Sequence, residues 1–193
     1  MNISSVCLFC GSGTGNRAAY GVAAARLGRI LAASGIRMIF GAGSIGLMGI
    51  AARAALEAGG EVYGIIPAHL NSTEISLNGL TRLEVVDSMH ERKRRMFDYA
   101  NAFVVLPGGI GTLDEILEVI TWRQLGLHNK PIVIVDCDNY WQPLIDLFEH
   151  CRAREFVGNG IFSLFHRVDT VDAAVDLLTA SELPQPHDES KLI

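Results

Sequence analysis

The stretch 101–121, NAFVVLPGGIGTLDEILEVIT, constrains the fold of this chain more than any other. Its apolar run 103–106 is typical of a short strand buried on both faces. The turn 107–109 ends that strand, because proline cannot donate to a ladder and glycine accepts backbone angles that other residues avoid. Beyond Thr112 the apolar residues recur with helical spacing. A strand, a glycine turn and a helix in this order leave backbone N–H groups free to bind an anion, and phosphate is the anion we expect there.

Glu115 in this predicted helix allows two interpretations. Thr112-x-x-Glu115 matches a capping box, in which the glutamate only satisfies an N-terminal amide. Asp114, Glu115 and Glu118 would also suit the first turns of a helix, because carboxylates interact favourably with the positive end of its dipole. Alternatively, Glu115 acts on a ligand held by the glycine turn. The residues alone leave both roles open.

Length, charge and hydropathy exclude several classes of protein. A chain of 193 residues predicts one domain with a sizeable core. Although 49% of the residues are hydrophobic, no apolar run is long enough to span a bilayer. The N-terminus lacks the basic region of a signal peptide. A net charge of −5 argues against sequence-independent nucleic-acid binding, which needs a broad basic surface. We therefore expect a cytoplasmic protein that binds neither membrane nor nucleic acid.

The four cysteines, Cys7, Cys10, Cys137 and Cys151, are too few for a disulfide framework in a chain of this length. Cys7 and Cys10 have the spacing of half a metal or redox site, but the sequence offers no second pair with zinc spacing. Both lie in a predicted strand, where positions three apart face opposite sides. Buried free thiols, and no metal, are the expectation.

Strand and helix patterns alternate along the chain, with short connections. Strands are predicted at 6–10, 37–40, 62–66, 83–86, 103–106 and 132–135, and helices at 20–33, 50–58, 89–100, after 112, 141–155 and 171–179. This alternation predicts a single-domain, Rossmann-like α/β fold, a parallel sheet with helices on both faces, over residues 1–180. Residues 181–193 are predicted to form a flexible tail. Ligands of such folds bind beyond the carboxyl ends of the strands, where the glycine turns 11–15, 41–49 and 108–111 should converge.

One of these turns matches a dinucleotide-binding pattern. Gly41-x-Gly43-x-x-Gly46 has the required spacing, but it follows the second predicted strand instead of the first. The acid that should close the next strand and hold a ribose hydroxyl is missing, since Glu61 opens that strand and Pro67 closes it. The motif therefore does not predict a nicotinamide cofactor.

The predicted helix 89–100 carries a run of basic residues, and most such runs form a solvated face. On a helical wheel Met89, Arg92, Lys93 and Met96 fall in one arc, so two charges lie on the apolar side. Burial of an unpaired charge costs several kcal/mol. The partner is expected to be a carboxylate at 115 or 118, or a bound phosphate, unless the side-chain stems carry the charges to the surface.

Two motifs together, MHERK at 89–93 and PGGIGTLDE at 107–115, closely resemble the Lonely Guy (LOG) family, the cytokinin riboside 5′-monophosphate phosphoribohydrolases. The resemblance extends over about 6–178. CGS at 10–12 and the turn 41–49 also fit. Ile110, where plant members often carry an aromatic residue, and Asp114, where many have glutamate, depart from the family pattern and bear on the preferred nucleobase.

This resemblance implies hydrolysis of the N-glycosidic bond of a purine nucleoside 5′-monophosphate, which gives free base and ribose 5-phosphate. The nucleotide is AMP or an N6-prenylated relative, and the sequence leaves this open. It implies Arg92 and Glu115 as the catalytic pair, no cofactor, and at least a homodimer with active sites near the subunit interface. The substrate contacts expected from the resemblance and from the glycine turns are Glu74, Met89, Lys93, Gly108, Gly109, Ile110, Gly111, Thr112, Leu113, Asp114, Thr121, Gly11, Ser12, Gly41 and Gly43.

The chemistry of such a cleavage fits these residue types. Its transition state resembles an oxocarbenium ion, so a carboxylate near C1′ can stabilise positive charge or activate water. The group that protonates the departing base stays open between Glu118 and a water molecule. The rival reading is a non-catalytic nucleotide or molybdenum-cofactor carrier of the same fold. A PLP-dependent decarboxylase is the weakest reading, because no lysine follows a histidine as a Schiff-base lysine usually does there.

Overall fold

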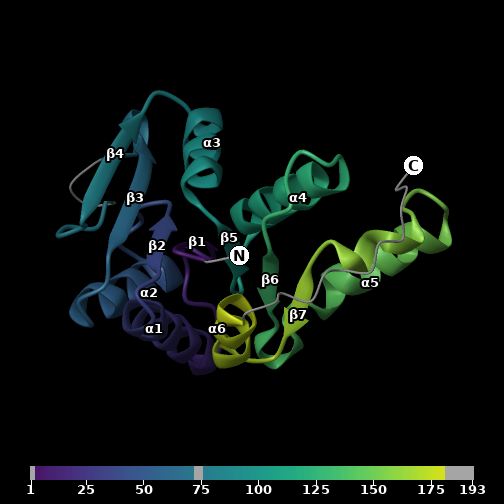
Figure 1. Ribbon diagram of the computed structural model, residues 1–193, viewed down its shortest axis with the longest axis horizontal. Helices are drawn as coiled ribbons and strands as arrows, with labels where there is room; N and C mark the ends of the chain where they lie inside the picture. Colours follow the sequence, from purple (N-terminus) through teal and green to yellow (C-terminus); the bar gives the residue numbers. More distant parts are fainter. Residues whose placement is uncertain (1–2, 72–75, 181–193) are drawn as a thin grey trace.

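Seven strands form one all-parallel sheet in the computed structural model, which describes residues 3–71 and 76–180 (Figure 1). The strands are β1 (Ser5–Phe9), β2 (Arg37–Phe40), β3 (Val62–Pro67), β4 (Arg82–Val86), β5 (Ala102–Val105), β6 (Ile132–Val135) and β7 (His166–Val168). They lie in the order β4-β3-β2-β1-β5-β6-β7, and every pairing is parallel. The order therefore reverses between β1 and β5, and the carboxyl ends of these two strands border the crevice in which such sheets bind ligands.

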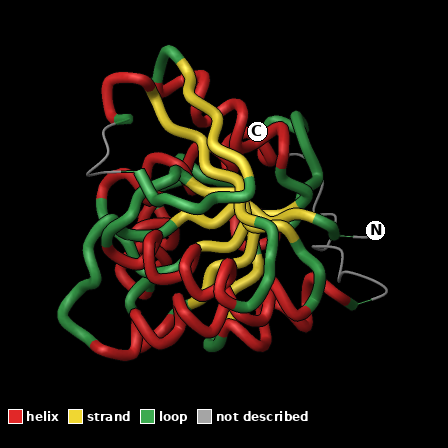
Figure 2. The backbone as a smooth tube through the Cα atoms, turned by 90° about the vertical axis from the view of Figure 1, so that its left-hand side faces the viewer, coloured by secondary structure: helices red, strands yellow, loops and turns green. Residues whose placement is uncertain are grey.

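Helices cover both faces of the sheet, as Figure 2 shows. The described residues form six α-helices. They are α1 (Ala18–Ala33), α2 (Gly46–Glu57), α3 (Met89–Tyr99), α4 (Ile110–Gln124), α5 (Gln142–Ala153) and α6 (Val171–Thr179), with short 3₁₀ helices η1 (Ala68–Leu70), η2 (Cys137–Asn139) and η3 (Asn159–Ser163). Buried residues of α1, α2 and α6 share one core, and those of α3, α4 and α5 share the other (Figure 1). The predicted single-domain Rossmann-like fold is confirmed.

The central strands are apolar except for Ser5 and Arg37, which begin β1 and β2, because each strand packs into both cores. In β1, Val6 and Leu8 pack on the side of α1, whereas Cys7 and Phe9 pack on the side of α4. Alternate residues of a strand point to opposite faces, so a strand covered on both sides carries apolar residues on both faces. Cys10 lies in the first core and Cys7 in the second, as predicted, and all four cysteines are free.

Several boundaries differ from the sequence prediction. Helix α2 begins at Gly46 instead of residue 50, because the φ of +62° at Gly46 turns the chain directly into the helix. Strand β7 was not predicted, since three residues of the sequence HRV carry no alternating pattern. Helix α4 begins at Ile110, earlier than its apolar spacing indicates.

Two parts of the prediction concern residues outside the described ranges: the predicted tail 181–193 and the predicted substrate contact Glu74. Within the described residues, no helix is long and apolar enough to cross a membrane.

Candidate active site

Three glycine-containing turns meet at the carboxyl ends of β1, β2 and β5, and backbone hydrogen bonds hold them together. The Gly11 N–H donates to the Pro107 carbonyl at 3.0 Å, which joins the turn after β1 to the turn after β5. The Leu47 N–H donates to the Gly11 carbonyl at 3.0 Å, which joins the turn after β1 to the start of α2. The Leu77 N–H donates to the Ala42 carbonyl at 2.9 Å. The predicted convergence of these turns is confirmed.

The turns enclose a cavity of about 350 Å³. Ten of the predicted site residues line it: Gly11, Ser12, Gly41, Gly43, Arg92, Gly109, Ile110, Gly111, Thr112 and Glu115. Five further residues that the sequence prediction did not include complete the wall: Cys10, Ile45, Met48, Ile66 and Leu70. These additional residues are apolar or thiol groups, so the cavity combines one wall of backbone amides with one apolar wall.

Six predicted contacts do not line this cavity: Met89, Lys93, Gly108, Leu113, Asp114 and Thr121. Met89 and Lys93 instead contact residues that do line it or that lie beside it. Thr121 is exposed and its hydroxyl donates to the Leu117 carbonyl at 2.7 Å, as a helical threonine without a ligand usually does. Gly108 lines a second, adjoining cavity.

The amino end of α4 presents backbone donors to the cavity. Gly109 is its N-cap, no side chain caps it, and the first bond within the helix runs from the Leu113 N–H to the Gly109 carbonyl at 3.0 Å. The preceding N–H groups of this turn therefore have no intrahelical acceptor. A Cβ atom added to Gly109 or Gly111 would meet no atom of the described structure within 4 Å, so a ligand can approach this backbone closely. Thr112 lies inside the helix, and the capping-box interpretation of Glu115 is therefore wrong.

Arg92 reaches the cavity from α3, whose start is fixed by an N-cap: the Glu91 N–H donates to the Ser88 hydroxyl at 3.1 Å. The guanidinium donates from Nη2 to the Gly41 carbonyl at 3.2 Å, and Nη1 lies 3.7 Å from the Met89 sulfur. Its Nε is buried and has no hydrogen-bond partner in the described structure. A buried donor of a charged group without a partner is costly, and it is a typical sign of a missing ligand.

The guanidinium also explains the first glycine of the dinucleotide-like motif. A Cβ atom at Gly41 would lie 1.6 Å from Nη2 of Arg92, so only glycine leaves room for this side chain. At Gly46 the φ is +62° and a Cβ atom would lie 2.2 Å from the Ser12 backbone. Gly41 and Gly46 therefore serve arginine placement and turn packing.

Glu115 lies one turn into α4, half-buried against the same cavity. Burial raises the pKa of its carboxyl from 4.5 to about 7, because desolvation disfavours the charged form. The positive charge of Arg92 lowers the pKa, and the negative charge of Asp114 raises it. A carboxyl with a pKa near neutrality in a cavity is the kind of group that enzymes use for acid–base chemistry.

Lys93 binds carboxylates of α4 and does not face the cavity. Its ammonium lies 3.0 Å from Asp114 and 3.1 Å from Glu118, and its side chain is 15% exposed. Burial alone would lower the pKa of the Lys93 ammonium, but hydrogen bonds to these two carboxylates raise it above its usual value. The sequence prediction of a carboxylate partner at 118 is confirmed for Lys93. Arg92 forms no ion pair within the described residues.

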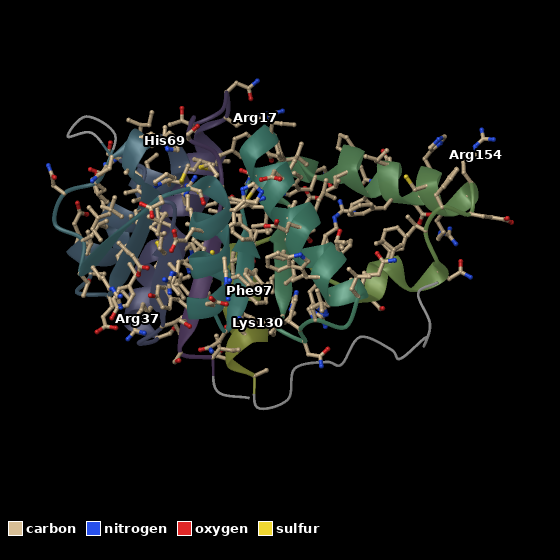
Figure 3. The ribbon with its side chains drawn as sticks, turned by 90° about the horizontal axis from the view of Figure 1, so that it is seen from above. Arg17, Arg37, His69, Phe97, Lys130 and Arg154 are labelled. Carbon is tan, nitrogen blue, oxygen red and sulfur yellow. The ribbon has the colours of Figure 1, made fainter. Side chains whose placement is uncertain are left out.

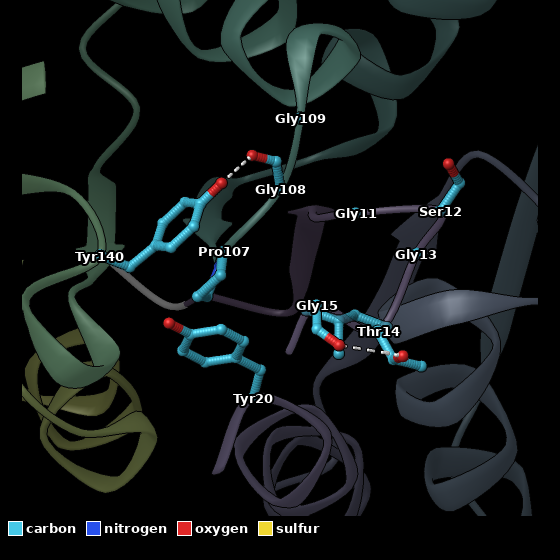
Figure 4. Close-up of a pocket in the computed structure, with 11 residues that line it drawn as sticks. Gly11, Ser12, Gly13, Thr14, Gly15, Tyr20, Pro107, Gly108, Gly109 and Tyr140 are labelled. Carbon is cyan, nitrogen blue, oxygen red and sulfur yellow. Dashed lines mark hydrogen bonds between the residues drawn. The ribbon is translucent and has the colours of Figure 1, made fainter. Parts of the chain in front are cut away.

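A second cavity, of about 280 Å³, adjoins the first across Gly11, Ser12 and Gly109 (Figure 4). The rings of Tyr20 and Tyr140 form one side of it, and the turns after β1 and β5 form the other. The Tyr140 hydroxyl donates to the Gly108 carbonyl at 2.5 Å. Sequence reasoning missed Tyr140, although Asp138 and Asn139 before it are residues that tolerate a tight turn.

No lysine of the described structure is placed for a Schiff base in either cavity. The Lys130 ammonium donates to the Phe97 carbonyl at 2.7 Å and lies 3.8 Å from the centre of the Phe97 ring (Figure 3). Lys130 precedes β6, so it sits at the amino end of the sheet, opposite the glycine turns. Among the described residues, no group of three or more His, Cys, Asp or Glu side chains could hold a metal ion.

Fold and cavity define a class: a Rossmann-like α/β protein with a ligand cavity where the strand order reverses. A molybdenum cofactor binding protein from the phototrophic bacterium Rippkaea orientalis has this fold, with a TM-score of 0.70 and 17% identity over 92% of this chain and 96% of that one. A molybdenum cofactor carrier protein from Chlamydomonas reinhardtii has it too, with a TM-score of 0.67 and 24% identity over 90% and 96% of the two chains. At these identities the likeness shows the fold alone.

Sequence similarity places the chain within that class. A family model described as "Possible lysine decarboxylase" matches residues 48–178. A probable cytokinin riboside 5′-monophosphate phosphoribohydrolase of Oryza sativa subsp. japonica is 47% identical over 152 residues, which cover 79% of this chain and 68% of the relative. A cytokinin riboside 5′-monophosphate phosphoribohydrolase of Rhodococcoides fascians is 44% identical over 154 residues, covering 79% and 78%. The chain therefore belongs to the LOG family of cytokinin riboside 5′-monophosphate phosphoribohydrolases.

Proposed function

We propose that this protein hydrolyses the N-glycosidic bond of a cytokinin riboside 5′-monophosphate. Water and the nucleotide give the free N6-substituted adenine and ribose 5-phosphate. The observation that carries the proposal is the placement of Arg92 and Glu115 on one cavity, beside the uncapped amino end of α4. The curated relatives named above are phosphoribohydrolases of this kind.

The amino end of α4 is the proposed site for the 5′-phosphate. The N–H groups of the turn 109–112 have no intrahelical acceptor, and the positive end of the helix dipole favours an anion there. The buried Nε of Arg92 would gain a partner from a phosphate or ribose oxygen. A guanidinium suits such oxygens because its donors form a planar fork.

Glu115 is proposed to act at the anomeric carbon. In its ionised form the carboxylate stabilises the developing oxocarbenium charge or removes a proton from the attacking water. Its pKa of about 7 keeps a substantial ionised fraction at neutral pH. A weakly solvated carboxylate interacts more strongly with a nearby positive charge than one in bulk water does. Binding energy from the phosphate then serves to orient C1′ toward this group.

The proton for the departing base is proposed to come from a water molecule and not from Glu118. The Glu118 carboxylate binds the Lys93 ammonium at 3.1 Å, and it is not part of the cavity wall. Lys93 is accordingly proposed to brace α3 against α4 and to neutralise the two carboxylates beside Glu115. In this arrangement the phosphate is held by the backbone amides and Arg92.

The apolar wall favours an N6-prenylated base over plain adenine. Ile45, Met48, Ile66 and Leu70 line one side of the cavity, and Ile110 at its mouth is 85% exposed. A prenyl substituent that covers such a surface gains roughly 25 cal/mol for each Å² removed from water. The preference is measured by the ratio of kcat/KM for isopentenyl-AMP and AMP.

A homodimer is proposed because α4 carries an exposed apolar stripe. Ile110, Leu117 and Leu125 are 85%, 39% and 61% exposed, and helical spacing places them on one side together with Asp114 and Thr121. The stripe begins at the cavity mouth, so a partner that covers it would also border the site. Sedimentation velocity would report a dimer, and a monomer at working concentration would overturn this proposal. Four free cysteines favour a reducing compartment such as the cytoplasm.

The reaction is tested by chromatography of free base released from isopentenyl-AMP and from AMP. We expect release by the wild type and a loss of at least about a hundredfold in Glu115→Gln, as is typical when an acid–base group is removed. Glu118→Gln is the matched control on the same helix and should retain most of the activity. A folded wild type that binds both nucleotides without releasing base would favour the carrier reading.

A further inference from the structure

Tyr140 lies outside the cavity proposed to bind substrate, yet it contacts the turn that forms one wall of it. It follows β6 and η2, and its hydroxyl donates to the Gly108 carbonyl at 2.5 Å (Figure 4). Gly108 belongs to the second cavity, and Gly109, the next residue, borders both cavities. The hydrogen bond therefore acts on the peptide group that separates them.

Because the 108–109 peptide is trans, the hydrogen bond from Tyr140 also sets the direction of the Gly109 N–H. The C=O and N–H of one peptide unit point in opposite directions, and the described chain contains no cis peptide. With the Gly108 carbonyl directed at Tyr140, the Gly109 N–H is directed away from the second cavity. Gly109 is the N-cap of α4, and no side chain of the described residues forms a capping hydrogen bond at this end of the helix.

We infer that Tyr140 is a positioning residue for phosphate: its hydroxyl fixes the 108–109 peptide so that the Gly109 N–H faces the phosphate of the substrate. The inference rests on the proposed function in one respect, namely that a phosphate binds at this turn. Gly108 needs such a restraint because it is a glycine, and glycine peptides rotate more readily than others. It must be glycine because a Cβ atom there would lie 2.1 Å from the Thr112 hydroxyl oxygen.

The surroundings of Tyr140 are rigid enough for this role. Its ring packs edge-on against Tyr20, with centroids 5.7 Å apart, and against Trp141, with centroids 5.0 Å apart. The buried Asp136 carboxylate accepts a hydrogen bond from the Trp141 N–H at 2.6 Å and pairs with Arg167. These contacts anchor the segment on which Tyr140 lies.

The turn before Tyr140 also adopts an uncommon backbone conformation. Asp138 and Asn139 have φ values of 57° and 55°, in the left-handed region, which aspartate and asparagine enter more readily than other non-glycine residues. Such conformations persist only where the surrounding structure enforces them, and they cluster at functional sites. Here they bring the tyrosine ring back over the carboxyl end of the sheet.

The test compares Tyr140→Phe with Tyr20→Phe, a matched control that removes a hydroxyl from the facing ring of the same cavity. Both are made in the Glu115→Gln background, so that binding is measured without turnover and does not depend on catalysis. The Tyr20 hydroxyl has no hydrogen bond recorded in the described structure. Calorimetry gives the Kd of AMP, and competition against bound AMP gives the Ki of inorganic phosphate.

We expect Tyr140→Phe to weaken both AMP and inorganic phosphate by about tenfold, the scale of one well-formed hydrogen bond, and Tyr20→Phe to change neither. In active protein the same variant should raise KM while kcat changes less than about twofold, since a phosphate contact made in both ground and transition states is uniform binding. Equal affinities in the two variants, or weaker AMP binding with unchanged phosphate binding, would overturn the inference. Failure of catalysis in the wild type would leave the binding comparison valid.

Discussion

Glu115→Gln should stabilise the ligand-free protein above neutral pH, although it removes the proposed catalytic group. Burial raises the pKa of Glu115 because the folded protein disfavours its charged form. At pH 8 the wild type must therefore fold with a carboxylate that is better solvated in the unfolded chain. Glutamine has the same shape and carries no charge, so the variant avoids this cost.

The size of the effect follows from the pKa. A rise from 4.5 to about 7 corresponds to about 3 kcal/mol, at about 1.4 kcal/mol for each pKa unit. Because the folded pKa is higher than the unfolded one, the folded state holds its proton more tightly, and the wild type loses stability as the pH rises from 4.5 to about 7. The difference between variant and wild type should be near zero below pH 4.5 and complete above about pH 7. For a chain of this length, about 3 kcal/mol raises Tm by roughly 6–12 °C.

The assay is urea unfolding, without nucleotide, at several values of pH between 5 and 8.5. The control is Asp176→Asn, which removes an exposed carboxylate of α6 far from the cavity and should change stability by less than about 0.5 kcal/mol at every pH. The measured quantity is the difference in unfolding free energy between each variant and the wild type. A Glu115→Gln difference that is constant across this range, or that is destabilising at pH 8, would refute the argument that desolvation sets the pKa of Glu115.

Two further predictions concern the same cavity. Gly41→Ala should fold with nearly normal stability but lose most activity, because the added Cβ atom meets only the end of the flexible Arg92 side chain. Gly46→Ala should instead be strongly destabilised, because its φ is +62° and its Cβ atom would clash with the Ser12 backbone. Thermal unfolding and base-release assays separate the two, and an active Gly41→Ala would contradict the placement of Arg92. The pH profile of kcat/KM should rise about tenfold per pH unit up to about 7 and then level off, if ionised Glu115 is the working form as proposed. A profile that falls over this range would show that the protonated form is the active one.

The fold was largely predictable, because its signals are local. Apolar runs such as 103–106 and 132–135 give the buried parallel strands, and the glycine turns give the ends of β1, β2 and β5. The start of α2 was not predictable in the same way, since it depends on a positive φ at Gly46 and on packing against Ser12. Strand β7 is added by pairing with β6, which no pattern within three residues can indicate.

The site was predictable as a set of turns but not as a set of contacts. The sequence indicated a carboxylate partner at 118, but not that Lys93 would bind it together with Asp114. Nor did it indicate that Arg92, the neighbour of Lys93, would face Gly41. Adjacent residues of a helix point about 100° apart, and only the position of α3 relative to α4 decides which one enters the cavity. Tyr140 was missed for a similar reason, because its partner Gly108 lies 32 positions earlier in the chain.

The chain has the fold of cofactor-carrier proteins and belongs to a hydrolase family. These two findings are compatible, because one part of the site suits ligand binding and another part suits catalysis. The converging turns and the uncapped end of α4 can only bind, and a carrier needs no more than that. Arg92 and Glu115 are added to this frame at a cost: a buried Nε with no hydrogen-bond partner among the described residues in one case, and a raised pKa in the other. Both costs would be avoided by smaller neutral side chains, and a carrier would have no reason to bear them. Two groups whose placement costs free energy therefore face one cavity, which favours catalysis over storage, and the Nε of Arg92 is where we expect a substrate oxygen to bind.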